Sequence, residues 1–178
     1  MQVTIDRMEA ADLEDVIRIE RQSFPTPWRA ETFRYEVAGN DNACYVVARA
    51  HLPEGRRVIG YAGMWLVADE AHITTIAVDP AYRGLKIGER LLVSILDAAI
   101  RQGMLRATLE VRESNRVAQK LYVKYRFDAV GMRRHYYSDT GENAIIMWIE
   151  NLRDPAFQRI FRANRRLLQE DSRALARH

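Results

Sequence analysis

Residues 76–92, IAVDPAYRGLKIGERLL, pass from an apolar strand through a short loop into a helix. Asp79-Pro80 ends the strand, and the helix is predicted to begin within Gly84–Gly88. A helix N-terminus presents unpaired N–H donors and the positive end of its dipole, and Arg83 and Lys86 add two cations. The loop is neither a Walker A loop nor Gly-x-Gly-x-x-Gly. It predicts an anion site suited to a diphosphate, although an ordinary loop entering a helix fits the local pattern equally well.

The segments on either side predict a mixed α/β fold. The order is a strand, two helices, three strands, the helix after the loop, a strand, a helix and a final pair of strands. This order indicates one central mixed, mostly antiparallel sheet flanked by helices, with Ser114 as the expected cap of the helix before the last strand pair. The predicted strands are 3–5, 45–50, 58–67, 71–78, 105–112, 127–137 and 144–149, and the predicted helices are 12–20, 28–37, 84–103, 114–125 and 154–170.

Length and composition are those of one folded domain. The chain has 178 residues, of which 48% are hydrophobic and 29% charged. Its single cysteine, Cys44, allows no internal disulfide. No stretch approaches the roughly 20 apolar residues of a membrane span, and residues 1–9 lack the layout of a signal peptide. We therefore expect a cytoplasmic protein without a membrane partner, and the spacing of its four histidines predicts no metal site.

The C-terminal segment differs from the rest of the chain in charge. Residues 151–178 carry seven Arg against three acidic residues, which gives +4, so residues 1–150 sum to −1 of the overall +3. We expect a main domain over 1–150 and a basic amphipathic helical extension over 151–178. A near-neutral main domain argues against direct nucleic-acid binding. The apolar stripe of the extension must be covered by the domain or by a second subunit in a homodimer; it comprises Phe157, Ile160, Phe161, Leu167 and Leu168.

The stretch at 76–92 resembles the acetyl-CoA loop of the GNAT-superfamily acetyltransferases. Within that superfamily the chain is similar to the RimI-type ribosomal-protein-alanine N-acetyltransferases, and the resemblance covers roughly residues 3–150. It also rests on residues 23–28 (SFPTPW), on LEVRESN with the LY pair within 109–122, and on RRHYY and ENA within 133–144. Lys86 departs from the family pattern because it stands where Arg-x-x-Gly-x-Gly has its middle glycine. The chain also has Arg126-Phe127 where the family has Gly-Phe.

The resemblance implies that acetyl-CoA is the co-substrate. It implies that the strand backbone at 76–78 hydrogen-bonds the pantetheine arm and that the N–H of Val78 polarises the thioester carbonyl. Asn115 is implied to contact the cofactor, and its position at a helix start is also that of a cap. The implied cofactor-binding residues are Ile76, Ala77, Val78, Arg83, Gly84, Leu85, Lys86, Ile87, Gly88, Glu89, Asn115 and Tyr122.

Two catalytic roles follow from the same resemblance. Glu110 corresponds to the family's base, and it lies on the polar face of a strand whose other face is apolar through Leu109 and Val111. Pattern alone favours a surface carboxylate paired with Arg112 or Arg83 over a base. Tyr122 corresponds to the general acid, because a phenol stays protonated at neutral pH and can donate to a leaving thiolate. Packing beside its helix neighbours is the alternative for Tyr122.

The resemblance also points to the acceptor. Tyr136 and Tyr137 lie near a predicted loop where the family holds an acceptor peptide, and Trp28 either shapes the same groove or anchors the second helix. We expect a protein N-terminal acetyltransferase that acts on the N-terminal alanine of a ribosomal small-subunit protein. An acetyltransferase for a small amine or a protein lysine is the first alternative. A ribosome- or partner-binding module that works through the basic tail is the second.

Overall fold

The computed structural model describes residues 1–175 and confirms the predicted order of strands and helices. Two short 3-10 helices, η1 and η2, add to the predicted elements. The elements are β1 (Gln2–Arg7), η1 (Ala10–Asp12), α1 (Leu13–Ser23), α2 (Ala30–Ala38), β2 (Ala43–Leu52), β3 (Gly55–Val67), β4 (Glu70–Val78), η2 (Pro80–Tyr82), α3 (Ile87–Arg101), β5 (Arg106–Arg112), α4 (Arg116–Lys124), β6 (Asp128–Tyr137), β7 (Glu142–Ile149) and α5 (Pro155–Leu175).

The strands form a seven-stranded sheet in the order β1-β2-β3-β4-β5-β7-β6. In the described part of the chain every neighbouring pair is antiparallel except β4 and β5. These two strands are joined by the long crossover that contains α3, as a parallel connection requires. The single parallel pair lies in the middle of the sheet, and the loop predicted to bind an anion leaves the opposite end of β4, beyond its recorded pairing with β5.

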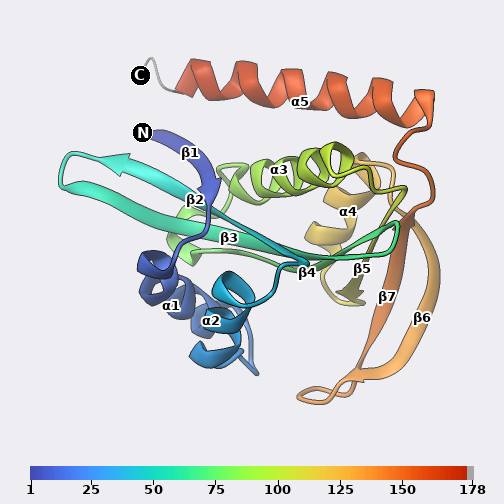
Figure 1. Ribbon diagram of the computed structural model, residues 1–178, viewed down its shortest axis with the longest axis horizontal. Coiled ribbons are helices and arrows are strands. Elements are labelled where there is room, and N and C mark those ends of the chain that lie inside the picture. The colour runs from blue at the N-terminus through green and yellow to red at the C-terminus, as the bar shows by residue number, and fades with distance from the viewer. Residues whose placement is uncertain (176–178) are drawn as a thin grey trace.

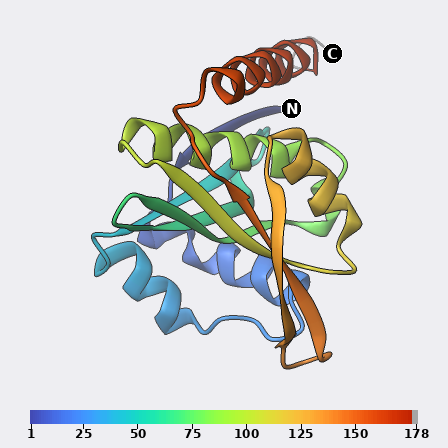
Figure 2. The ribbon, with the colours of Figure 1, turned by 90° about the vertical axis from the view of Figure 1, so that its right-hand side faces the viewer.

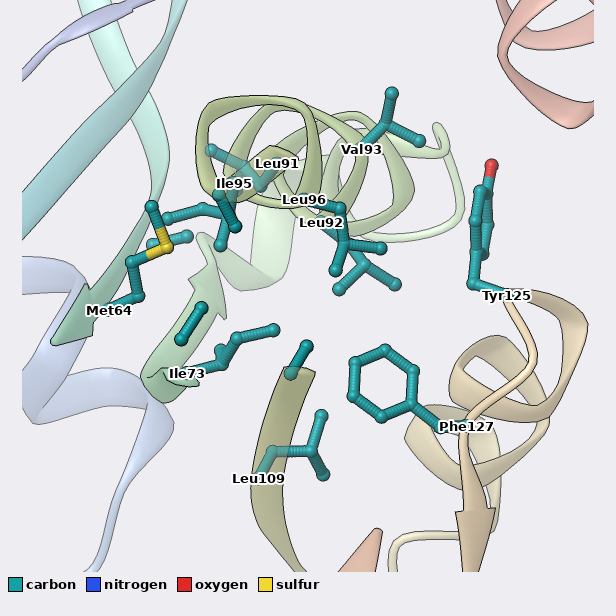
Figure 3. Close-up of a cluster of buried hydrophobic side chains, with 14 of the residues drawn as sticks. Met64, Ile73, Leu91, Leu92, Val93, Ile95, Leu96, Leu109, Tyr125 and Phe127 are labelled. Carbon is teal, nitrogen blue, oxygen red and sulfur yellow. The ribbon is translucent and has the colours of Figure 1, made fainter. Parts of the chain in front are cut away.

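Helices cover both faces of the sheet (Figures 1 and 2). On one face α3 packs its apolar stripe on the central strands, and Figure 3 shows Leu92 and Leu96 meeting Leu109 of β5 and Phe127. On the other face α1 and α2 bury Val16, Ile19 and Phe33 against β2, β3 and β4. The apolar spacing that predicted these helices therefore matches the faces that they bury.

α5 lies over α3 on the outer side of that layer (Figure 1). Three of the five apolar residues of its predicted stripe, Phe157, Phe161 and Leu168, are buried in the same core as α3, and Phe161 packs edge-on against Tyr125. Leu167 is 57% exposed. The division into 1–150 and 151–178 stays a prediction. No helix within residues 1–175 is long and apolar enough to cross a membrane.

Two local expectations were wrong. Asn115, not Ser114, caps α4, because the Asn115 side chain accepts the N–H of Ala118 at 3.1 Å. The second helix begins at Ala30 rather than at Trp28, because Arg29 is its N-cap and has an extended backbone with φ −77° and ψ 154°.

Candidate active site

A cleft opens where β4 and β5 separate. The two strands pair only at Glu70–His72 with 106–108, and no pairing is recorded beyond this point within the described chain. The resulting cleft has a volume of about 320 Å³ and lies between residues 73–76 of β4 and residues 109–112 of β5. Six residues predicted for the site line it: Ile76, Glu110, Asn115, Tyr122, Tyr136 and Tyr137.

The open edge of β4 offers backbone groups to this gap. The N–H of Asp79 donates to Ile59 O on β3 at 2.9 Å. Because N–H groups alternate sides along a strand, the N–H of Val78 points to the opposite edge. The carbonyl of Val78 also faces away from β3, since it accepts Arg83 Nε at 3.2 Å. An extended chain lying in the gap could therefore bond with β4 as a further strand would.

Glu110 lies on the cleft-facing side of β5 and is held by two partners. Its Oε2 is 2.7 Å from His72 Nε2, and its Oε1 is 3.4 Å from Arg133 Nε. The hydrogen bond with His72 lowers the pKa of the Glu110 carboxyl, against the opposing effect of burial, and Arg133 lowers it further. Glu110 is therefore a carboxylate at neutral pH, and His72 Nε2 is the donor. The partners suggested by pattern, Arg112 and Arg83, are not the ones that the structure records.

Tyr122 reaches the cleft from α4. Its ring packs edge-on against Phe127 with centroids 5.7 Å apart, so the packing alternative holds as well as the position in the cleft. Burial raises the pKa of its phenol well above the usual value. The phenol therefore stays protonated at neutral pH and can donate its proton. Asn115 both caps α4 and lines the cleft, so its two proposed roles are compatible.

A bulge in β6 brings two adjacent tyrosines to one cleft. Side chains of consecutive strand residues point to opposite faces, yet Tyr136 and Tyr137 both line the cleft. The register of β6 with β7 shifts between Arg133 and Tyr137, and His135 has a left-handed backbone with φ 51°. The two rings contact each other edge-on at 5.2 Å. The sequence predicted both residues but carried no signal for the bulge.

Arg112 ties this end of β6 to β5. Its guanidinium donates to both carboxylate oxygens of Asp139, at 3.2 and 2.7 Å, and it lies 3.9 Å from the centroid of the Tyr137 ring. Glu142 approaches the same guanidinium at 3.5 Å. Burial raises the pKa of the Tyr137 phenol to about 12, although Arg112 opposes this shift. Arg112 thus holds the turn between β6 and β7 at the cleft wall.

The opposite wall is held by a buried carboxylate that sequence reasoning missed. Glu20 of α1 accepts the backbone N–H of Trp28 at 2.9 Å and the hydroxyl of Tyr61. Burial raises the pKa of the Glu20 carboxyl, and these hydrogen bonds partly offset the shift. Trp28 packs on Phe33 and also lines the cleft, so both of its proposed roles hold.

Three signals in the sequence could have found the missed residues. Glu20 is an acidic residue next to Ile19 in the buried stripe of α1, which is costly unless it has partners. Arg112 shares the period-two polar face of β5 with Glu110. His72 alternates in the same way with Thr74 on β4.

The loop at 83–88 has the geometry expected of an anion site. Lys86 occupies the N-cap of α3 with a left-handed backbone, φ 58° and ψ 19°, and its side chain makes no capping hydrogen bond. The first N–H donors of α3 therefore have no cap from Lys86. Gly84 also has a positive φ, and a Cβ there would meet nothing within 4 Å, so the loop surface is open. A diphosphate therefore fits the residues present at this helix start.

Several residues predicted to bind the cofactor point their side chains elsewhere. Arg83 folds back on Val78 O, and Ile87 is buried in the core. The Glu89 carboxylate accepts Tyr125 Oη at 2.7 Å and Lys124 Nζ at 2.5 Å. Ile87 and Glu89 can serve an anion through their backbone N–H groups, while their side chains fix α3 to its neighbours.

The sequence matches the Acetyltransferase (GNAT) family over residues 13–127. It is 39% identical over 145 residues to the putative [ribosomal protein bS18]-alanine N-acetyltransferase of Bacillus subtilis, and the aligned region covers 82% of this chain and 93% of that protein. It is 40% identical over 151 residues to the N-alpha-acetyltransferase RimI of Mycobacterium tuberculosis, and the aligned region covers 82% of this chain and 90% of that protein.

Two solved structures share this fold. The ribosomal-protein-S18-alanine N-acetyltransferase from Escherichia coli superposes with a TM-score of 0.75 at 31% identity, over 83% of this chain and 93% of that chain. Ard1 from Thermoplasma volcanium superposes with a TM-score of 0.73 at 28% identity, over 84% of this chain and 97% of that chain. The part of the chain that matches the family model contains Glu110, Asn115 and Tyr122 of the cleft.

Proposed function

This chain is an acetyl-CoA-dependent N-acetyltransferase of the GNAT family, and on that premise we propose that it acetylates the N-terminal α-amine of a protein. The observation that carries the proposal is the cleft, in which an ionised Glu110 and a protonated Tyr122 lie between two aromatic walls. By similarity to its relatives, the expected acceptor is the N-terminal alanine of a ribosomal small-subunit protein.

The cofactor would be held along β4 and the start of α3. The N–H donors at the loop 83–88 receive the diphosphate, and the open edge of β4 at 76–78 receives the pantetheine arm. Acetyl-CoA supplies the acetyl group as a thioester. The N–H of Val78 lies on the open edge of β4, where it can donate to a carbonyl oxygen on which negative charge builds.

Glu110 would take the proton of the acceptor. An N-terminal ammonium has an unperturbed pKa of about 8, so it must lose a proton before it can act as a nucleophile. Glu110 can accept this proton directly or through a water, and His72 orients the carboxylate by donating from Nε2. The low pKa of Glu110 keeps it ionised, so it also attracts the cationic amine into the cleft.

Tyr122 would protonate the leaving sulfur. Its raised pKa keeps the phenol in the donor form, and its side chain lines the same cleft as Glu110. The α-ammonium loses two protons on its way to the amide: Glu110 takes the first before attack and passes it to solvent, and the second leaves the nitrogen of the tetrahedral adduct. This second proton offsets the one that Tyr122 gives to the leaving thiolate, so the transfer releases one proton in all.

The two aromatic walls would hold the acceptor as a peptide. Trp28 and Phe24 come from the segment after α1, and Tyr136 and Tyr137 come from the end of β6. Three of these four rings carry a polar N–H or O–H, which suits a chain that presents both backbone and side chains, whereas a small amine would leave much of the cleft unfilled. A protein lysine remains the competing acceptor. Family membership sets aside the alternative of a binding module without activity.

The cellular location of the protein and its macromolecular partners stay predictions. We place the reaction in the cytoplasm, without direct contact to nucleic acid. A homodimer through α5 would have to use its outer face, because Phe157, Phe161 and Leu168 are already buried on the domain. Analytical ultracentrifugation measures the oligomeric state, and we expect no dimer whose interface uses the buried residues Phe157, Phe161 and Leu168.

Initial rates on a panel of ten-residue peptides test the proposed function. The peptides differ only in the first residue, and each is paired with a copy whose α-amine is already acetylated. We expect transfer to free α-amines, fastest for alanine, and none to the blocked copies. Acetylation of blocked peptides at lysine alone would overturn the proposal.

A further inference from the structure

α5 brings an acidic side chain to the loop that starts α3. The helix is fixed along its length by the buried Phe157, Phe161 and Leu168 and by Arg165, whose Nη1 lies 2.6 Å from Asp97 Oδ1 on α3. Figures 1 and 2 show α5 running along the outer side of α3. The packing leaves the later part of α5 above the N-terminal end of α3.

At this point Asp171 meets Lys86. Asp171 Oδ2 lies 2.5 Å from Lys86 Nζ, and both side chains are about half exposed. The ion pair raises the pKa of Lys86 and lowers the pKa of Asp171, so both groups are charged at neutral pH. Lys86 is the N-cap of α3, a position at which the resemblance implies a glycine. Its cation is therefore already engaged by a carboxylate before any ligand arrives.

We propose that Asp171 is a further determinant of acetyl-CoA affinity, which weakens binding by engaging Lys86 and by placing a negative charge beside the phosphate loop. The inference rests on the proposed placement of the diphosphate at 83–88. A diphosphate at the helix start would draw on the same ammonium that Asp171 now holds. The carboxylate and the phosphates compete for one cation, and they repel each other.

The expected change in acetyl-CoA affinity is small, because the ion pair of Lys86 and Asp171 is about half exposed to solvent. Exposed ion pairs contribute little, because water and salt screen both charges. Neutralising Asp171 should therefore tighten acetyl-CoA binding about two- to five-fold at low salt. The gain should shrink as salt rises, since the Debye length falls from about 14 Å at 0.05 M to about 6 Å at 0.3 M.

Glu170 provides a matched control. It is exposed on the same helix, one residue before Asp171, and no ion pair of Glu170 is recorded among the described residues. Glu170→Gln removes the same formal charge without freeing Lys86. Lys86→Met separates the two parts of the proposal, because without the lysine Asp171→Asn can act only by removing the repulsion of the phosphates and the weaker interaction of Asp171 with Arg90 and Lys124.

The experiment is calorimetric titration of acetyl-CoA into the full chain and its Asp171→Asn, Glu170→Gln, Lys86→Met and Lys86→Met/Asp171→Asn variants, at 0.05 and 0.3 M salt. We expect tighter binding for Asp171→Asn, no change for Glu170→Gln, and less than half of the gain when Lys86 is absent. An unchanged or weaker affinity in Asp171→Asn, or an equal gain in Glu170→Gln, would overturn the inference.

Failure of the proposed function gives a different result. A chain that binds acetyl-CoA but acetylates no α-amine would overturn the proposed acceptor and leave the comparison of Asp171→Asn with Glu170→Gln decisive. A wild-type chain that does not bind acetyl-CoA would overturn both.

Discussion

The loop at 83–88 and the cleft around Glu110 are built in opposite ways. The loop is one continuous stretch, and it offers mainly backbone donors at the start of α3. The cleft is assembled from α1, β4, β5, α4 and β6, and its groups act through side chains held by long-range partners. His72 and Glu110, for example, are 38 residues apart in the chain yet 2.7 Å apart in space.

Because of this difference, the loop should tolerate side-chain substitutions to which the cleft is sensitive. Backbone donors persist through most side-chain substitutions, so the loop should tolerate changes that leave its conformation intact. A side chain in the cleft depends on its own chemistry and on the partner that orients it. Substitutions in the cleft should therefore affect turnover strongly, and substitutions in the loop should affect cofactor affinity weakly.

The largest expected effect comes from removing the base. Glu110→Gln keeps the shape and a hydrogen bond to His72 but cannot accept a proton, so kcat should fall about 10²- to 10⁴-fold. The dissociation constant of acetyl-CoA should stay unchanged, because Glu110 is not part of the loop. Steady-state kinetics and calorimetry on the same preparation measure the two quantities.

Glu150→Gln serves as the control, since Glu150 is exposed at the end of β7. The pH profile adds a second check. Glu110 has a lowered pKa and is ionised at neutral pH, so the rise of kcat/KM between pH 6 and 9 should follow the α-ammonium, with a pKa of about 8. Full kcat across pH in both Glu110→Gln and Tyr122→Phe would show that the acid and base assignments are wrong.

The next effect concerns the clamp on the turn between β6 and β7. Arg112→Met removes the paired hydrogen bonds to Asp139 and the contact with Tyr137, so the peptide wall should lose its position. We expect kcat/KM for the peptide to fall about 10- to 100-fold with acetyl-CoA affinity unchanged. Arg116→Met on α4 is the control, and an equal loss of acetyl-CoA affinity would argue that Arg112 acts on the whole fold.

A smaller effect is expected at His72. His72→Leu removes the hydrogen bond that lowers the pKa of Glu110, so that pKa should rise. Because the base form exists above this pKa, the loss of kcat/KM caused by protonation of Glu110, which lies below the limb set by the α-ammonium, should begin at higher pH than in the wild type. We also expect kcat to fall about three- to ten-fold. His72→Gln retains an N–H donor and should restore most of the rate. If the loss of kcat/KM at low pH begins at the same pH in His72→Leu as in the wild type, His72 only packs.

The same contrast explains how far the sequence could be read. Strand and helix periodicity predicted the order of the elements, because each pattern is local. The loop was predictable for the same reason, and its one strained position, Lys86, stood out as a departure from glycine. Glu110 and Tyr122 were found by resemblance, but their surroundings were not. The His72–Glu110 contact arises only when β4 and β5, far apart in the chain, pair in register. The bulge at His135 is a shift in the pairing of β6 with β7, and the Glu20–Trp28 link forms when the chain after α1 folds back on that helix.

The smallest effect is expected in the loop. Lys86→Gly removes a left-handed non-glycine residue, so the melting temperature should rise by about 2–4 °C. Acetyl-CoA affinity should change by less than about three-fold, because the ammonium of Lys86 is already engaged by Asp171. Thermal unfolding and calorimetry measure both values. A loss of affinity above ten-fold would show that Lys86 is the main phosphate ligand.

One competition within a single molecule tests the assignment of the cleft most directly. A peptide that begins with alanine and carries one internal lysine is incubated with the chain and acetyl-CoA, and fragmentation by tandem mass spectrometry locates the first acetyl group. If Glu110 and the aromatic walls select an N-terminal α-amine, the first acetyl group appears on the alanine nitrogen, and the Glu110→Gln variant slows its appearance. A first acetyl group on the lysine would contradict this assignment.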